Sequence, residues 1–201
     1  MSDWTQAPVL AGRNARLEPL AVAHVDGLRA ATDEVLAGCW YTSVPPPDQV
    51  EAYVDSALRM QAQGRALAFV VLDADGEVAG ATRLYDLDPA TPRVQIGYTW
   101  YARRVQRTGV NTEVKRLLLA HAFDTLGCVA VGFQTSWFNR ASRNAIERLG
   151  AKRDGVIRNH QRHADGSLRD TVTYSIIDSE WPAVRRNLDD LLARHAVELG
   201  H

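Results

Sequence analysis

The strongest constraint on the fold is the stretch at residues 66–87, ALAFVVLDADGEVAGATRLYDL, in which two β-rich runs flank an Asp-Gly turn. Residues 66–72 are the longest uninterrupted apolar run, which has the length of a strand and is too short for a membrane helix. The Asp-Gly step supplies the positive φ that a tight hairpin needs. The stretch therefore predicts two antiparallel strands, and its DADG lacks the later glutamate of a calcium loop.

A third strand is predicted at residues 93–101, RVQIGYTWY, with Gly97 in its interior. An interior glycine weakens a strand, so it indicates a bulge or a close backbone approach. After a turn containing Gly109, a long helix begins near Val110 with apolar stripes on two sides, which predicts burial on both. Its solvated sector comprises Glu113, Arg116, Ala120 and Asp124, whereas His121 is predicted to be a hydrogen-bonded core histidine.

The remaining elements follow from periodicity and turn residues. They are a strand at 15–20, helices at 21–32 and 49–63, a strand at 128–136, a helix at 139–150, a second Asp-Gly hairpin ending near 177, and a last helix at about 180–197. Asp48 and Ser179 are the expected caps of the second and the last helix. The order predicts a mixed α/β sheet flanked by helices.

Composition limits the class of protein. With 201 residues and 46% hydrophobic content, the chain predicts one domain over residues 1–201. A net charge of -1 argues against recruitment of nucleic acid or anionic lipid. Cys39 and Cys128 lack metal-ligand spacing, and the N-terminus lacks a signal-peptide pattern, so we expect a soluble, cytoplasmic protein without a metal.

The glycine turn after the third strand indicates an anion site. A strand, a turn and a helix aim free backbone N–H groups and the helix dipole at one place, which favours negative charge. No G-K-[ST] follows Gly109 and no G-x-G-x-x-G is present, so neither a Walker P-loop nor a dinucleotide fingerprint is indicated. A glycine that only permits the turn is the alternative interpretation.

Several motifs resemble one superfamily in order along the chain. Residues 106–111, QRTGVN, are similar to the Q/R-x-x-G-x-G/A signature of the GNAT acetyltransferases, with Asn111 where Gly or Ala is usual. QIGYTWY resembles the splayed strand before that signature, and NRASRNAIERLGA resembles a later helix. The resemblance is closest to the ribosomal-protein N-terminal (RimJ/RimL-type) branch. It implies a GNAT-like α+β fold: a central mixed, mostly antiparallel sheet with splayed strands, flanking helices and a C-terminal helix.

The resemblance also implies a donor site for acetyl-CoA, used as a co-substrate. Backbone amides near Trp100 and Tyr101 would meet the thioester and pantetheine, and the turn would hold the pyrophosphate. The implied donor-binding residues are Trp100, Tyr101, Gln106, Arg107, Thr108, Gly109, Val110, Asn111, Thr112 and Arg143. Arg103, Arg104 and Arg107 are further candidates for phosphate contacts, with solvated surface charge as the alternative.

For catalysis the resemblance points to the helix that begins at Asn139. Many family members place a tyrosine seven positions later, where this chain has Ile146, whereas the Rim-type branch uses a serine three positions later, which is Ser142. Ser142 is therefore the expected proton donor to the coenzyme A sulfur, and Asn139 the orienting group. Helix capping by Asn139 would explain both residues equally well.

The identity of a general base is open, because Gln95 stands where family members commonly have glutamate. Asp86 and Glu113 are by default surface carboxylates. About a quarter of an α-amino group but only about 0.1% of a lysine is neutral near pH 7.4, so we expect an acceptor of low pKa, a peptide N-terminus or a small-molecule amine. Trp40, Tyr41, Tyr85 and Gln95 are the candidate acceptor-binding residues, and a homodimer is possible.

Two other functions stay open at this level. Gln95 and Asn111 are compatible with a catalytically weak acyl-CoA-binding regulatory or interaction module, and the strand–turn–helix unit is compatible with another nucleotide binder. A zinc site at His160 and His163 is disfavoured, because their spacing suits a helix and the segment has a strand pattern.

Overall fold

A computed structural model describes residues 4–42, 44–163 and 165–199, with side chains to residue 196. The described residues form one eight-stranded sheet in the order β1-β2-β3-β4-β5-β6-β8-β7, in which β5 and β6 are parallel and the other neighbours antiparallel. The strands are β1 (Leu10–Ala11), β2 (Ala15–Pro19), β3 (Ala66–Asp73), β4 (Val78–Asp88), β5 (Arg93–Tyr101), β6 (Ala130–Ser136), β7 (Lys152–Arg162) and β8 (Leu168–Ile177).

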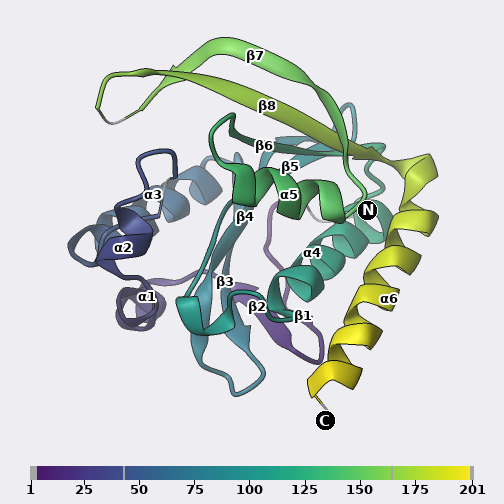
Figure 1. The fold of residues 1–201 in the computed structure, drawn as a ribbon, viewed down its shortest axis with the longest axis horizontal. Coiled ribbons are helices and arrows are strands. Elements are labelled where there is room, and N and C mark those ends of the chain that lie inside the picture. The colour runs from purple at the N-terminus through teal and green to yellow at the C-terminus, as the bar shows by residue number, and fades with distance from the viewer. Residues whose placement is uncertain (1–3, 43, 164, 200–201) are drawn as a thin grey trace.

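Helices cover both faces of the sheet (Figure 1). They are α1 (Val25–Ala31), α2 (Glu34–Ala37), α3 (Val50–Ala62), α4 (Val110–Ala120), α5 (Arg140–Arg148) and α6 (Trp181–Leu199). One core joins α4, α5 and α6 to the sheet, and a smaller core joins α1 and α3 to the opposite face. α4 and α6 lie side by side, and β7 with β8 arches beyond the rest of the sheet (Figure 1).

This architecture confirms the predicted fold class: a mixed, mostly antiparallel sheet with flanking helices and a C-terminal helix. The first hairpin is confirmed, with Gly76 at φ 81 and the Asp73 carboxylate accepting from the amides of Asp75 and Glu77. In the described part of the chain no helix is both long and apolar enough to cross a membrane.

Two predicted helix caps are wrong. α3 begins at Val50 after a 3₁₀ turn, Pro47–Gln49, that contains Asp48, and the residue at the cap position is Gln49. Ser179 lies inside the 3₁₀ turn Asp178–Glu180, ahead of α6. In both cases an added tight turn moves the helix start beyond the capping residue, which the sequence pattern does not indicate.

The predicted solvated sector of α4 is wrong at Glu113, which is 7% exposed. Its carboxylate accepts hydrogen bonds from the amides of Arg13 and Asn14, which precede β2, so the helix ties down the chain there. His121 is buried as predicted, at the start of a π-helical turn, His121–Thr125. However, its Nε2 has no hydrogen-bond partner among the described residues.

Candidate donor and acceptor site

The central feature of the site is the point at which β5 and β6 separate. In the described chain their ladder has three pairs, Arg93 with Ala130, Val94 with Val131 and Gln95 with Gly132. β5 nevertheless continues along β4 to Tyr101, and β6 continues along β8 to Ser136. Beyond Gln95 the facing edges of the two strands therefore have no strand partner, and their backbone polar groups need another one.

β5 carries a bulge immediately beyond this point. Its register against β4 shifts between Ala81 and Arg83, and Tyr98 has φ 52. Gly97 is required here because a Cβ would lie 2.7 Å from the Tyr85 ring. Both sequence predictions for Gly97, a bulge and a close approach, are thus confirmed. The Tyr53 hydroxyl donates to the Tyr98 carbonyl at 3.3 Å and holds the bulge from the α3 side.

The glycine turn leads from β5 into α4 as predicted. Thr108 Oγ1 donates to the Val105 carbonyl at 2.6 Å and accepts from the Val110 amide at 3.3 Å. The other amides of residues 107–112 have no hydrogen-bond partner among the described residues. These donors open the N-terminus of α4 with the helix dipole behind them, which is a favourable environment for an anion.

The three arginines of the turn have different surroundings. Arg103 pairs with Asp33 at 2.8 Å, and Arg104 pairs with Asp73 at 3.1 Å. Arg107, at φ 62, is exposed and has no ion pair in the described residues. Arg107 is therefore the turn arginine best placed to face an added phosphate.

The other implied donor residues have structural contacts of their own. Gln106 Nε2 donates to the Tyr101 carbonyl at 3.1 Å, and the Thr112 hydroxyl accepts from Arg148 at 2.9 Å. Arg143 stacks on the Trp137 ring at 4.4 Å and donates to the Trp137 carbonyl.

α5 begins directly after β6, on the splayed side. Asn139 Oδ1 accepts from the Ser142 amide at 3.0 Å, so the capping interpretation is confirmed. This bond occupies the amide of Ser142 and leaves its hydroxyl for other interactions. The backbone of Ser142 is therefore fixed relative to the end of β6.

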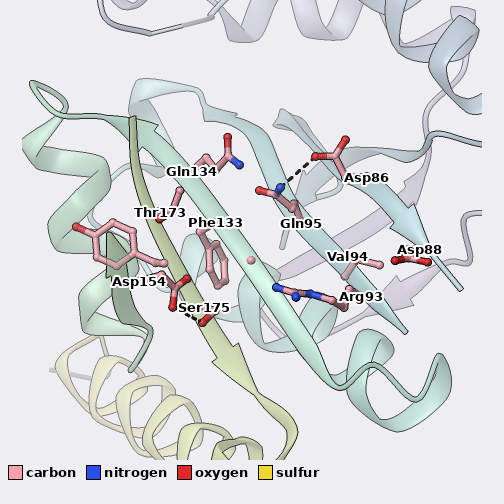
Figure 2. A pocket seen from close by; sticks show the side chains of 12 residues that line it. Asp86, Asp88, Arg93, Val94, Gln95, Phe133, Gln134, Asp154, Thr173 and Ser175 are labelled. Carbon is pink, nitrogen blue, oxygen red and sulfur yellow. Dashed lines mark hydrogen bonds between the residues drawn. The ribbon is translucent and has the colours of Figure 1, made fainter. Parts of the chain in front are cut away.

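On the α1–α3 side of the sheet a cavity of about 430 Å³ lies over β5, β6 and β8. Figure 2 shows Gln95 at its edge, with Nε2 donating to Asp86 Oδ2 at 3.0 Å. The Tyr85 hydroxyl donates to Gln95 Oε1 at 3.1 Å, and burial, the main cause, raises the pKa of that hydroxyl. Tyr85 and Gln95 are therefore brought together as predicted, and a carboxylate adjoins them.

The cavity is acidic. Asp86, Asp88 and Asp154 line it together with one cation, Arg93 (Figure 2). Asp154 accepts from the Ser175 hydroxyl at 2.8 Å. Three carboxylates against one guanidinium favour a positively charged occupant over a negative one.

Trp40 and Tyr41 belong to a different cluster. The Trp40 ring lies 5.5 Å from Tyr41, 5.4 Å from Phe138 and 4.8 Å from His163, measured between centroids. This aromatic cluster adjoins Asn139, which follows Phe138 directly. His163 thus packs on an indole, and no metal-binding group of three ligating residues occurs among the described residues.

Sequence reasoning missed two buried cations. Arg83 is 2% exposed and lies between the rings of Tyr53 and Tyr98, at 4.7 and 4.3 Å. Lys115 is 6% exposed and donates to Thr99 Oγ1 at 2.7 Å. Burial lowers the pKa of Lys115 to about 7. The helical wheel contained the signal, because Lys115 falls within the apolar stripe of Leu119.

Comparisons with known proteins match this geometry. A family model described as "Acetyltransferase (GNAT) domain" matches residues 14–152. The chain belongs to the GNAT acetyltransferase family. The match includes the splayed strands, the glycine turn and α5, so the resemblance noted in the sequence is confirmed.

Individual relatives agree. YdaF of Bacillus subtilis (strain 168), named "Putative ribosomal N-acetyltransferase", is 32% identical over 107 residues, which are 53% of this chain and 57% of YdaF. A GCN5-related N-acetyltransferase from Brucella melitensis has a TM-score of 0.84 at 33% identity, over 92% of this chain and 85% of that one. An acetyltransferase structure from T. thermophilus has a TM-score of 0.81 at 31% identity, over 92% and 97%. The chain thus spans little more than half of its curated relatives and nearly all of the structural ones.

Proposed function

We propose that this protein is an N-acetyltransferase of one domain, residues 1–201, which moves an acetyl group from acetyl-CoA directly to a primary amine. The observation that carries the proposal is the separation of β5 from β6 beyond Gln95, together with the open amides at residues 107–112. One end offers donors to a pyrophosphate and the other offers unpaired strand edges to an extended amide chain. The residues present therefore fit acetyl-CoA, and membership of the GNAT family supports the same donor.

In this proposal the neutral amine attacks the thioester carbonyl without a covalent enzyme intermediate. The carbon–nitrogen bond forms as the carbon–sulfur bond breaks, the ammonium loses one proton, and the thiolate gains one. Ser142 donates the proton to sulfur through the hydroxyl that its capped position leaves available. Asn139 fixes that residue at the end of β6. Backbone donors at the β5 bulge stabilise the developing oxyanion.

The acidic cavity is the proposed acceptor side. Its carboxylates attract an ammonium group, while Gln95 cannot itself accept a proton near neutrality. Asp86, hydrogen-bonded to Gln95, is the carboxylate that lies next to the point of separation. The absence of glutamate at position 95 favours an α-amino group or a small-molecule amine of low pKa over a lysine side chain.

Release of free thiol from acetyl-CoA, measured over a panel of amines, tests the function. The panel contains peptides with a free N-terminus, the same peptides blocked at the N-terminus with one free lysine, and small amines of graded pKa. We expect turnover with free N-termini or low-pKa amines. Faster turnover of the lysine peptides would reject the acceptor assignment. Donor binding without thiol release from any amine would instead indicate an acyl-CoA-binding module.

A further inference from the structure

The chain uses lysine at only two positions. Its 23 basic residues comprise 21 arginines, Lys115 and Lys152. Lys152 is exposed at the start of β7, where it pairs with Glu180 at 2.5 Å. Lys115, in contrast, is buried under the sheet. Arginine keeps its proton under all protein conditions, whereas lysine can lose it on burial. A buried lysine in an arginine-rich chain thus marks a position where a removable proton matters.

The contacts of Lys115 agree with a group that need not be charged. Its Nζ bonds to Thr99 Oγ1, which also lies 2.8 Å from Thr82 Oγ1. Thr99 and Thr82 are the polar partners in this chain of contacts, and neither is anionic. Burial is the cause that lowers the Lys115 pKa to about 7.

Charged groups on the neighbouring elements have other partners. Glu113 accepts from the amides before β2, and Arg116 pairs with Asp189 of α6 at 2.5 Å. Arg148 of α5 donates to the Thr112 hydroxyl.

The position of this bond relates it to the donor site. Thr99 lies in the β5 bulge, directly after Tyr98 with its φ of 52. Lys115 lies in the second turn of α4, whose first turn follows the open amides at residues 107–112. The Lys115–Thr99 hydrogen bond therefore ties the strand bulge to the helix that begins at the glycine turn.

We propose that Lys115 is a positioning residue of the donor site: through Thr99 it fixes the β5 bulge against α4, so that the thioester end and the pyrophosphate end keep the spacing that one coenzyme A molecule spans. The inference rests on the proposed function for its ligand. Arginine would not replace Lys115, because its larger fork would remain charged in this buried position.

Calorimetric titration with coenzyme A tests the role in Lys115→Met, Thr99→Val and the double variant, with Lys152→Met as the matched control. We expect each single variant to bind about tenfold more weakly, as loss of a buried hydrogen bond at a binding site predicts. The double variant should bind no more weakly than the weaker single variant, because both remove one interaction. Thr99→Ser, which keeps the hydroxyl, should retain wild-type affinity. KM for acetyl-CoA should rise while KM for the amine stays constant.

A second readout is independent of turnover. Protein made with ¹³Cε-lysine gives signals from only two lysine side chains, so each can be assigned by substitution. The Lys115 signal should titrate near pH 7 and shift when coenzyme A is added, while the Lys152 signal serves as the internal reference. If Lys115→Met does not fold, as judged by circular dichroism, the comparison of Thr99→Val with Thr99→Ser decides the question.

The outcomes separate the two proposals. Wild-type affinity in folded Lys115→Met and Thr99→Val would overturn the role of Lys115 and leave the proposed function intact. The same holds if the Lys115 signal stays fixed on ligand binding. If the wild-type protein does not bind coenzyme A, both proposals are rejected.

Discussion

The donor half and the acceptor half of the site are built in different ways. The donor half occupies one continuous segment, residues 93–112, in which a strand, a turn and a helix start present backbone amides. The acceptor half takes side chains from β4, β5, β6, β7 and β8 around one cavity. Amides are positioned by local secondary structure, whereas a side-chain pocket requires distant segments to meet. The donor half should therefore be sensitive to backbone changes, and the acceptor half to side-chain chemistry.

Two glycines give the largest expected contrast. Gly80 has φ 148, and a Cβ there would lie 2.1 Å from the Trp100 carbonyl oxygen, which is backbone. Gly80→Ala should therefore cost about 3 kcal/mol or more of unfolding free energy. At Gly97 the obstacle is the Tyr85 ring, which can rotate, so Gly97→Ala should cost about 1 kcal/mol and raise KM for the amine. Urea unfolding of both variants checks the order, and equal losses would contradict the contrast.

Ser142→Ala tests chemistry at the junction of the two halves. Loss of a general acid should lower kcat by about 10²-fold while coenzyme A affinity is retained. Ser56→Ala, on the exposed face of α3, is the matched control and should be neutral. A normal kcat in Ser142→Ala would assign Ser142 to helix structure alone.

The pH dependence of stability tests the buried lysine of the donor half. The folded pKa of about 7 lies below the ordinary 10.5, so the unfolded chain binds more protons between these values. Wild-type stability should therefore gain up to about 1.4 kcal/mol per pH unit from Lys115 above pH 7. Lys115→Met lacks this gain, so its stability relative to wild type should fall from pH 7 to pH 9. Parallel curves for the two proteins would contradict the burial argument, and Lys152→Met controls for loss of a surface lysine.

Tyr85→Phe gives the smallest expected effect and addresses the acceptor half alone. It removes the hydrogen bond to Gln95, which should cost about 1 kcal/mol, or about a fivefold rise in KM for the amine. KM for acetyl-CoA should not change. An equal rise in both constants would show that the two halves are coupled at Gln95.

The same contrast explains what the sequence could predict. The strand at residues 93–101, the role of Gly97, the turn at Gly109 and the cap at Asn139 all follow from local patterns, and the structure confirms them. The burial of Glu113 could not be predicted, because its partners are the amides of residues 13 and 14, about a hundred positions away.

The acceptor half shows the same limit. Gln95 could be singled out, but its contacts with Tyr85 and Asp86 depend on the β4–β5 register. The separation of Trp40 and Tyr41 into a cluster with His163 depends on loops that meet only in the folded chain.

Amide hydrogen exchange with and without acetyl-CoA tests the central claim most directly, because ligand contacts slow exchange at the amides they engage. The proposed donor site predicts protection at residues 107–112 and at the β5 bulge, with α1 and the outer β7–β8 hairpin unchanged. Protection confined to other segments, or no protection at saturating acetyl-CoA, would contradict it.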